Sequence, residues 1–122
     1  MIFLNPTRLQ EGPWQAFERV IARFLEHGGF QNVTVVGGPD DRGADIVAFI
    51  HGKRWLIQAK FRTSGSVGPE AIREAFNAQW DYEADVIVTA VNRKFTESAN
   101  TLRSDKINDG FKIFNWDRDY FI

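Results

Sequence analysis

The sequence predicts an α/β protein in which a mixed β-sheet is flanked by helices, with elements in the order α-β-β-β-α-β-α-β. Segments with helical periodicity alternate with short runs rich in β-branched residues, and turn residues separate them. Residues 46–50 are apolar at both odd and even positions. Because strand side chains alternate between faces, such a strand has two apolar faces, and helices must cover both.

The first predicted helix follows an irregular lead-in of residues 1–11, and the domain is expected to span residues 12–122. Pro13 suits the first turn of a helix, and Gly28-Gly29 supplies a left-handed end. Between them, the apolar residues that recur at helical spacing are Trp14, Phe17, Val20, Ile21, Phe24 and Leu25. A short strand is predicted at residues 33–36.

The next two strands, at residues 44–50 and 54–61, are most simply a β-hairpin, whose register depends on the length of its loop. A loop of three residues would place Asp45 opposite Ala59, whereas a loop of two or four residues would pair it with Lys60. We predict the second register, because it brings Asp45 and Lys60 onto one face of the sheet.

The second half of the chain alternates helices and strands. We predict a Ser/Gly loop at residues 62–68, a helix from Pro69 to about Trp80, a strand at residues 85–90, a helix capped by Thr96 and ended by Gly110, and a strand at residues 111–115. No internal repeat and no low-complexity segment interrupts this order.

The composition restricts the class of protein. With 122 residues, 43% of them hydrophobic, the chain is expected to form one domain with a real core rather than a disordered segment. It has no cysteine, which excludes thiolate catalysis and cysteine zinc sites, and its two histidines argue against a histidine metal site. A net charge of −1 leaves nucleic-acid binding open, because a local basic patch is compatible with a neutral total. No run approaches the ~20 apolar residues of a membrane span and no signal peptide is apparent, so we expect a cytoplasmic protein or a piece of one.

The residues that point most directly to chemistry are Asp45, Gln58 and Lys60. Asp45 opens a predicted strand directly after a loop rich in turn residues. Gln58 and Lys60 are two apart on the next strand, so they project to one side while Ala59 points to the other. A carboxylate, an amide oxygen and an ammonium at one end of a sheet form a site for a hard cation and a phosphate.

Such a site suits hydrolysis of a phosphodiester, which requires an activated water, a stabilised pentavalent phosphorus and a neutralised leaving oxygen. A divalent cation such as Mg²⁺ contributes to all three, and Mn²⁺ is expected to substitute for it. We expect Asp45 to be its first ligand, with the Gln58 amide oxygen and the Ala59 carbonyl as further ligands. Lys60 would position the attacking water or stabilise charge on the phosphate.

Glu18 is the fourth candidate in this site. On a helical wheel it lies at the edge of the apolar stripe, whereas the other charged residues of its helix, Arg19, Arg23 and Glu26, lie on the far side. We therefore expect its carboxylate to point at the sheet edge and to complete the metal shell directly or through water.

Taken separately, these residues have ordinary explanations. Asp45 is typical of a turn or cap residue, and Glu18 is typical of a solvated helix residue. Gln58 and Lys60 are compatible with an exposed strand end. The combination of all four, in this order and on these elements, is what favours a catalytic site.

The same combination resembles the Mrr-type branch of the PD-(D/E)xK nuclease superfamily, over about residues 12–122. The motifs that carry the resemblance are Phe17-Glu18, Gly43-Ala44-Asp45, Gln58-Ala59-Lys60, Val86-Ile87-Val88-Thr89 and Phe95-Thr96-Glu97-Ser98-Ala99. The wider superfamily has an acidic residue two positions before the lysine, and the Mrr-like branch is similar to this chain in having glutamine there. The missing negative charge predicts a modest metal affinity.

The resemblance implies a restriction-endonuclease-like fold and Mg²⁺-dependent DNA hydrolysis without a covalent intermediate. It also implies that such domains are often fused to helicase, DNA-binding or membrane modules, so we expect DNA as the substrate and either a homodimer or an associated helicase or DNA-recognition module. The expected contacts to DNA phosphates come from Arg62, Thr63, Ser64, Ser66 and Arg42. An ordinary solvated loop accounts for the first four equally well.

Two other functions remain open at this level. The same fold is compatible with a DNA- or DNA-end-binding module whose catalysis is weak or lost, although the complete set of four site residues argues against loss. A junction-resolving nuclease would share the fold and the metal chemistry, but a strongly basic surface is expected of it, and the near-neutral charge argues against that function. A purely structural domain would require the site residues to be scattered in space.

Overall fold

A computed structural model describes residues 14–36 and 43–121 of the chain. The lead-in of residues 1–11, the helix start at Pro13 and the proposed phosphate contact Arg42 lie outside the described residues. The elements are α2 (Trp14–His27), β1 (Gln31–Val35), β2 (Gly43–Ile50), β3 (Lys53–Lys60), α3 (Pro69–Tyr82), β4 (Val86–Val91), α4 (Glu97–Asn108), β5 (Ile113–Trp116) and α5 (Arg118–Phe121).

The five strands form one sheet in the order β1-β2-β3-β4-β5. The pairs β1/β2 and β2/β3 are antiparallel, whereas β3/β4 and β4/β5 are parallel. Parallel neighbours require long crossovers, and α3 and α4 make them. The mixed sheet and the predicted order of elements are therefore confirmed, with α5 added at the end of the chain.

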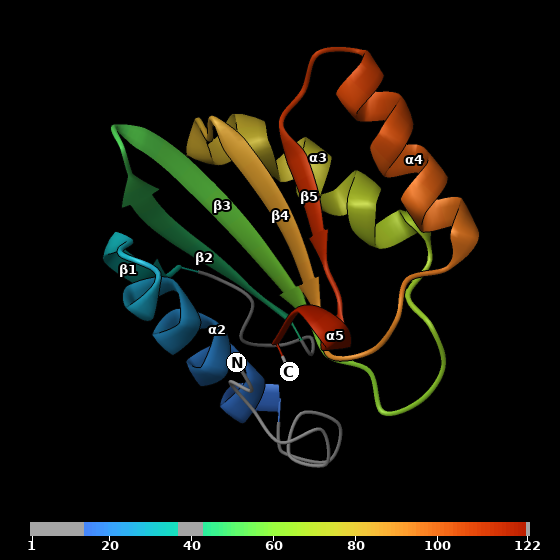
Figure 1. Cartoon of the computed structure of the whole chain (residues 1–122), viewed down its shortest axis with the longest axis horizontal. Coiled ribbons are helices and arrows are strands. Elements are labelled where there is room, and N and C mark those ends of the chain that lie inside the picture. The colour runs from blue at the N-terminus through green and yellow to red at the C-terminus, as the bar shows by residue number, and fades with distance from the viewer. Residues whose placement is uncertain (1–13, 37–42, 122) are drawn as a thin grey trace.

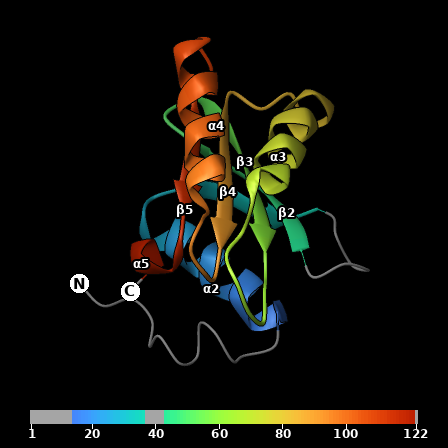
Figure 2. The ribbon, with the colours of Figure 1, turned by 90° about the vertical axis from the view of Figure 1, so that its right-hand side faces the viewer.

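Helices cover both faces of the sheet, as the apolar strands require. Figures 1 and 2 show α2 on one side of the sheet and α3 and α4 on the other. The core under α2 and α5 includes Phe17, Ile21, Ile57, Trp116 and Phe121. The core under α3 and α4 is formed by Ile72, Ala75, Ile87, Ala99 and Ile113. Residue parity along each strand decides which core a side chain enters.

The hairpin between β2 and β3 turns through only two residues, His51 and Gly52, which have φ values of 51° and 75°. Two successive positive φ values are typical of the type I′ turn, whose twist suits a tight hairpin. Asp45 consequently pairs with Gln58, and Lys60 pairs with Gly43. The predicted pairing of Asp45 with Lys60 is wrong by two residues, because that pairing requires a loop of four residues, whereas the two-residue loop pairs Asp45 with Gln58. Strand side chains alternate between faces, so a register that differs by two residues leaves each side chain on the predicted face. The prediction that Asp45 and Lys60 share a face is therefore confirmed.

The local signals at the helix ends operate as expected. Thr96 caps α4, since its hydroxyl accepts a hydrogen bond of 3.1 Å from the Ala99 amide. Gly29 follows α2 with a φ of 92°, a conformation that glycine adopts without strain. The predicted C-terminal strand is confirmed in a shorter form, but α5 was not predicted, because a helix of four residues has no periodicity to detect.

Candidate active site

The three central site residues lie where β2 begins and β3 ends. Asp45 and Gln58 are direct partners across the strands, and Lys60 follows Gln58 on the same face. Their neighbours Ile46 and Ala59 point to the opposite face and are buried under α2. The face that carries the site is the one covered by α3, which supplies two further side chains.

The carboxylate of Asp45 is held on both oxygens. Gln58 Nε2 donates a hydrogen bond of 3.0 Å to Asp45 Oδ1, and the Tyr82 hydroxyl donates one of 3.0 Å to Oδ2. Burial, followed by the hydrogen bond and charge of Asp45, raises the pKa of Tyr82, so the phenol remains a donor. These two bonds fix the carboxylate in one orientation while leaving each oxygen free to accept once more.

Lys60 is held by a carboxylate that sequence analysis did not identify. Its Nζ forms a close ion pair with Glu74 Oε2 of α3. The Lys60 side chain is only 14% exposed, whereas that of Glu74 is 52% exposed. An ammonium largely removed from water requires a partner, and Glu74 supplies one.

Glu74 and Tyr82 are the two site residues missed from the sequence. The available signal was the spacing of Glu74, Ala78 and Tyr82, which recur every four residues along one stripe of α3. Tyr82 lies two positions beyond the predicted end of this helix near Trp80. The missed residues therefore reflect an unrecognised helix face and a helix end placed too early.

Glu18 belongs to α2, which packs on the opposite face of the sheet from the other three candidates. Figures 1 and 2 show that α2 begins near the end of the sheet at which β3 ends. Within the described part of the chain, Glu18 forms no hydrogen bond or ion pair. Burial raises its pKa, and the nearby Arg19 lowers it by less. Its participation in the site stays a prediction, because no contact joins it to Asp45, Gln58 or Lys60 in the described residues.

The donors at this site fit a hard divalent cation. Gln58 Oε1 is buried without a hydrogen-bond partner, and Asp45 retains accepting capacity. Oxygen donors of this kind are those that Mg²⁺ prefers. Among residues 14–36 and 43–121 there is no cluster of three or more His, Cys, Asp and Glu side chains suited to a metal. A cation would therefore depend on amide or backbone oxygens as well as carboxylates, and the role of the Ala59 carbonyl stays a prediction.

A groove of about 410 Å³ lies on the site face, between the outer strands and the end of α3. Its lining includes Val36, Val47, Phe49, Arg54 and Tyr82. Since Tyr82 also donates to Asp45, the groove borders the site.

The predicted Ser/Gly loop after β3 is tied to the segment that follows β4 by several hydrogen bonds. Asn92 accepts a hydrogen bond of 2.8 Å from the Arg62 amide and donates one of 2.9 Å to the Arg62 carbonyl. Val67 and Lys94 are joined by a backbone bond of 2.8 Å, and Arg93 Nε donates to the Gly65 carbonyl over 2.8 Å. The other proposed phosphate contacts in this loop, Thr63, Ser64 and Ser66, are exposed.

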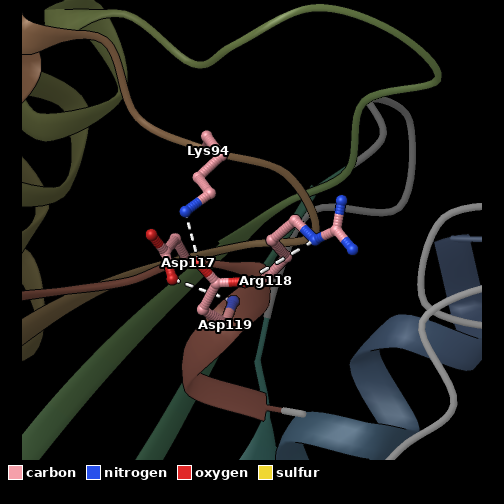
Figure 3. A network of polar contacts seen from close by, with 4 residues as sticks. All are labelled: Lys94, Asp117, Arg118 and Asp119. Carbon is pink, nitrogen blue, oxygen red and sulfur yellow. Dashed lines mark hydrogen bonds and ion pairs between the residues drawn. The ribbon is translucent and has the colours of Figure 1, made fainter.

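A further network joins this region to the C-terminal helix, as Figure 3 shows. Lys94 forms an ion pair with Asp119, Arg118 Nε lies 3.8 Å from Asp119 Oδ1, and the Asp119 amide donates to Asp117 Oδ1 over 2.9 Å. The hydrogen bond from Lys94 lowers the pKa of Asp119. Lys94 and Asp119 are both exposed, so their ion pair contributes little to stability.

Comparison with known proteins agrees with this architecture. The chain matches the Mrr_cat restriction endonuclease family over residues 9–121 and therefore belongs to this family. It is an Mrr-type restriction endonuclease catalytic domain, and the family implies a nuclease that acts on DNA. No curated protein and no solved structure matches the chain. In the described residues, no helix is both long and apolar enough to cross a membrane.

Proposed function

We propose that this chain is a metal-dependent endodeoxyribonuclease domain that hydrolyses DNA phosphodiester bonds in restriction, defence or repair. The observation that supports the proposal most strongly is the placement of Asp45, Gln58 and Lys60 on one face, at one end of the sheet. The orphaned Gln58 Oε1 beside the oriented Asp45 carboxylate is the arrangement expected of an oxygen-ligand cation site.

Each residue of the site has a role in the proposed mechanism. Asp45, the Gln58 amide oxygen and the Ala59 carbonyl would hold Mg²⁺ or Mn²⁺, with Glu18 joining directly or through water. When bound, the cation lowers the pKa of a water and neutralises charge on the phosphate oxygens. Lys60 carries the positive charge that stabilises the phosphate or positions the attacking water.

Substrate phosphates would be bound beside the site by the loop after β3. Arg62 supplies a cation, Thr63, Ser64 and Ser66 supply hydroxyls, and Arg42 is proposed to contribute from the segment before β2. The tie through Asn92 fixes the backbone of Arg62 at the end of the strand that carries Lys60. One site cleaves one strand, so cutting of both strands would require a homodimer or a fused or associated helicase or recognition module.

The proposal is tested by following supercoiled plasmid with the purified chain. We expect cleavage with Mg²⁺ or Mn²⁺ and none with excess chelator. Asp45→Ala and Lys60→Ala should each lower the rate by at least ~100-fold, because each removes a metal ligand or a main electrostatic stabiliser. If plasmid is bound but never cut under any metal condition, a DNA-binding module of the same fold becomes the better account. If both variants cut as fast as the parent chain, the proposed site is wrong.

A further inference from the structure

The charge balance of the site raises a question about its affinity for a cation. Asp45 contributes one negative charge, Lys60 one positive charge, and Gln58 none. A divalent cation placed beside this set would meet no net attraction from the three residues together. One more carboxylate within reach of the same face would restore the balance.

Glu74 is the described carboxylate that meets this requirement. It lies on α3, over the face that carries the site, and it already contacts Lys60 Nζ. Tyr82, which holds Asp45, lies two turns further along the same helix, about 12 Å away along its axis. The site is thus bracketed by α3, with Glu74 at the Lys60 end and Tyr82 at the Asp45 end.

A second observation points to a ligand between these groups. Gln58 lies between Asp45, its cross-strand partner, and Lys60, which is about 7 Å further along β3. Its Oε1 is buried and has no hydrogen-bond partner. A buried acceptor in this condition is normally satisfied by water or an ion. The Asp45 carboxylate, the Gln58 oxygen and the Glu74 carboxylate therefore form a series of oxygen donors along one face.

We propose that Glu74 is the carboxylate on the α3 face that joins Asp45 in the cation site and supplies the charge that Gln58 lacks. Without a cation, Glu74 neutralises the largely buried Lys60 ammonium. When a divalent cation binds, Glu74 turns to it, directly or through a bound water, and Lys60 Nζ is released toward the substrate phosphate. Cation binding and activation of Lys60 are thereby one coupled event. This inference rests on the proposed function and assigns a further residue to its site.

Mn²⁺ affinity, measured by calorimetric titration without DNA, tests the proposal. We expect Glu74→Gln to weaken binding by at least ~10-fold, the loss typical of removing a group that supports a metal site. Glu70→Gln, one turn earlier on the same helix, removes the same charge and should stay within about twofold of the parent. Because Glu74 is half-exposed, its variant should keep the fold, which a thermal melt verifies.

Asp45→Asn separates failure of this inference from failure of the proposed function. If Asp45→Asn loses Mn²⁺ binding but Glu74→Gln binds as the parent does, Glu74 is only an ion-pair partner and the inference is overturned. If Asp45→Asn also binds as the parent does, the cation site itself is wrong.

A measurement on the unaltered chain tests the coupling. Mg²⁺ added without DNA should shift the NMR signal of the Lys60 side chain, assigned by its absence in Lys60→Arg, because the ammonium changes partner. A Lys60 signal that stays constant while Mg²⁺ saturates the chain would overturn the exchange.

Discussion

The two faces of the sheet differ in what lies between strands and helices. Under α2 and α5 the contacts are apolar and largely aromatic, with Phe121 packed edge-on against Phe17 and Phe24 at ring distances of 5.7 and 5.5 Å. Under α3 and α4, a polar row crosses four strands, because Asp45, Gln58, Thr89 and Asn115 are successive register partners.

Several polar atoms in this second region lack a protein partner. Gln58 Oε1, Thr89 Oγ1 and Asn115 Oδ1 are buried without one. Period-two alternation therefore lets one set of strands form a stabilising core on one face and a chemical site on the other. The comparison implies that substitutions under α2 should act on stability, whereas those under α3 should act on cation binding and cleavage.

Phe121→Ala should give the largest effect on stability. Its side chain is fully buried, so we expect a loss of about 3–5 kcal/mol in the free energy of unfolding, measured by denaturant titration. Phe114→Ala, at a position 38% exposed on the same face, should cost clearly less. The folded fraction of Phe121→Ala should still cleave at the parent rate. A slower rate in that fraction would show that the two faces are not separable.

Tyr82→Phe should affect cleavage more than folding. It removes the hydrogen bond that fixes Asp45 Oδ2. A hydrogen bond to a charged group contributes about 1.4 kcal/mol, so its loss from the transition state should lower the cleavage rate about tenfold. Tyr120→Phe is the control, since that exposed ring lies on the other side of the sheet and stacks on Trp116. Equal cleavage rates for Tyr82→Phe and the parent would remove Tyr82 from the site.

Glu18→Gln should give the smallest effect on the free energy of unfolding. The direction in which that effect changes with pH reports on the environment of the Glu18 carboxylate. Burial raises the pKa of Glu18 in the folded chain, so the folded state binds a proton more readily than the unfolded state. The stability of the parent should therefore fall as pH rises through the raised pKa, and Glu18→Gln should remove that fall. Denaturant titrations between about pH 4 and pH 8 measure it, with Glu26→Gln as the exposed control on the same helix. If the stabilities of the parent and the variant vary with pH in parallel, the partly buried Glu18 carboxylate does not destabilise the folded chain.

The sequence predicted most of the fold because its signals are local. Periodicity gave α2, β-branched runs gave β4, and Thr96 marked the start of α4. Because Gln58 and Lys60 are two residues apart on one strand, they share a face in any register. The register itself depended on whether His51 would adopt a positive φ, which its identity does not determine.

The parts of the site that the sequence did not reveal depend on tertiary packing. Glu74 and Tyr82 become site residues only because α3 lies over the ends of β2 and β3. The same packing places α2, the helix that carries Glu18, on the opposite face of the sheet from α3, a relation that a helical wheel does not contain. The start of the domain at residue 12 stays a prediction.

The central claim is that the α3-covered face of the β2–β3 hairpin binds the catalytic cation. The most direct test is anomalous diffraction from crystals of the chain soaked in Mn²⁺ without DNA. We predict a peak on that face in contact with an Asp45 carboxylate oxygen and within reach of Gln58 Oε1. A peak on the α2 face, or a saturated crystal with no metal at Asp45, would contradict the account.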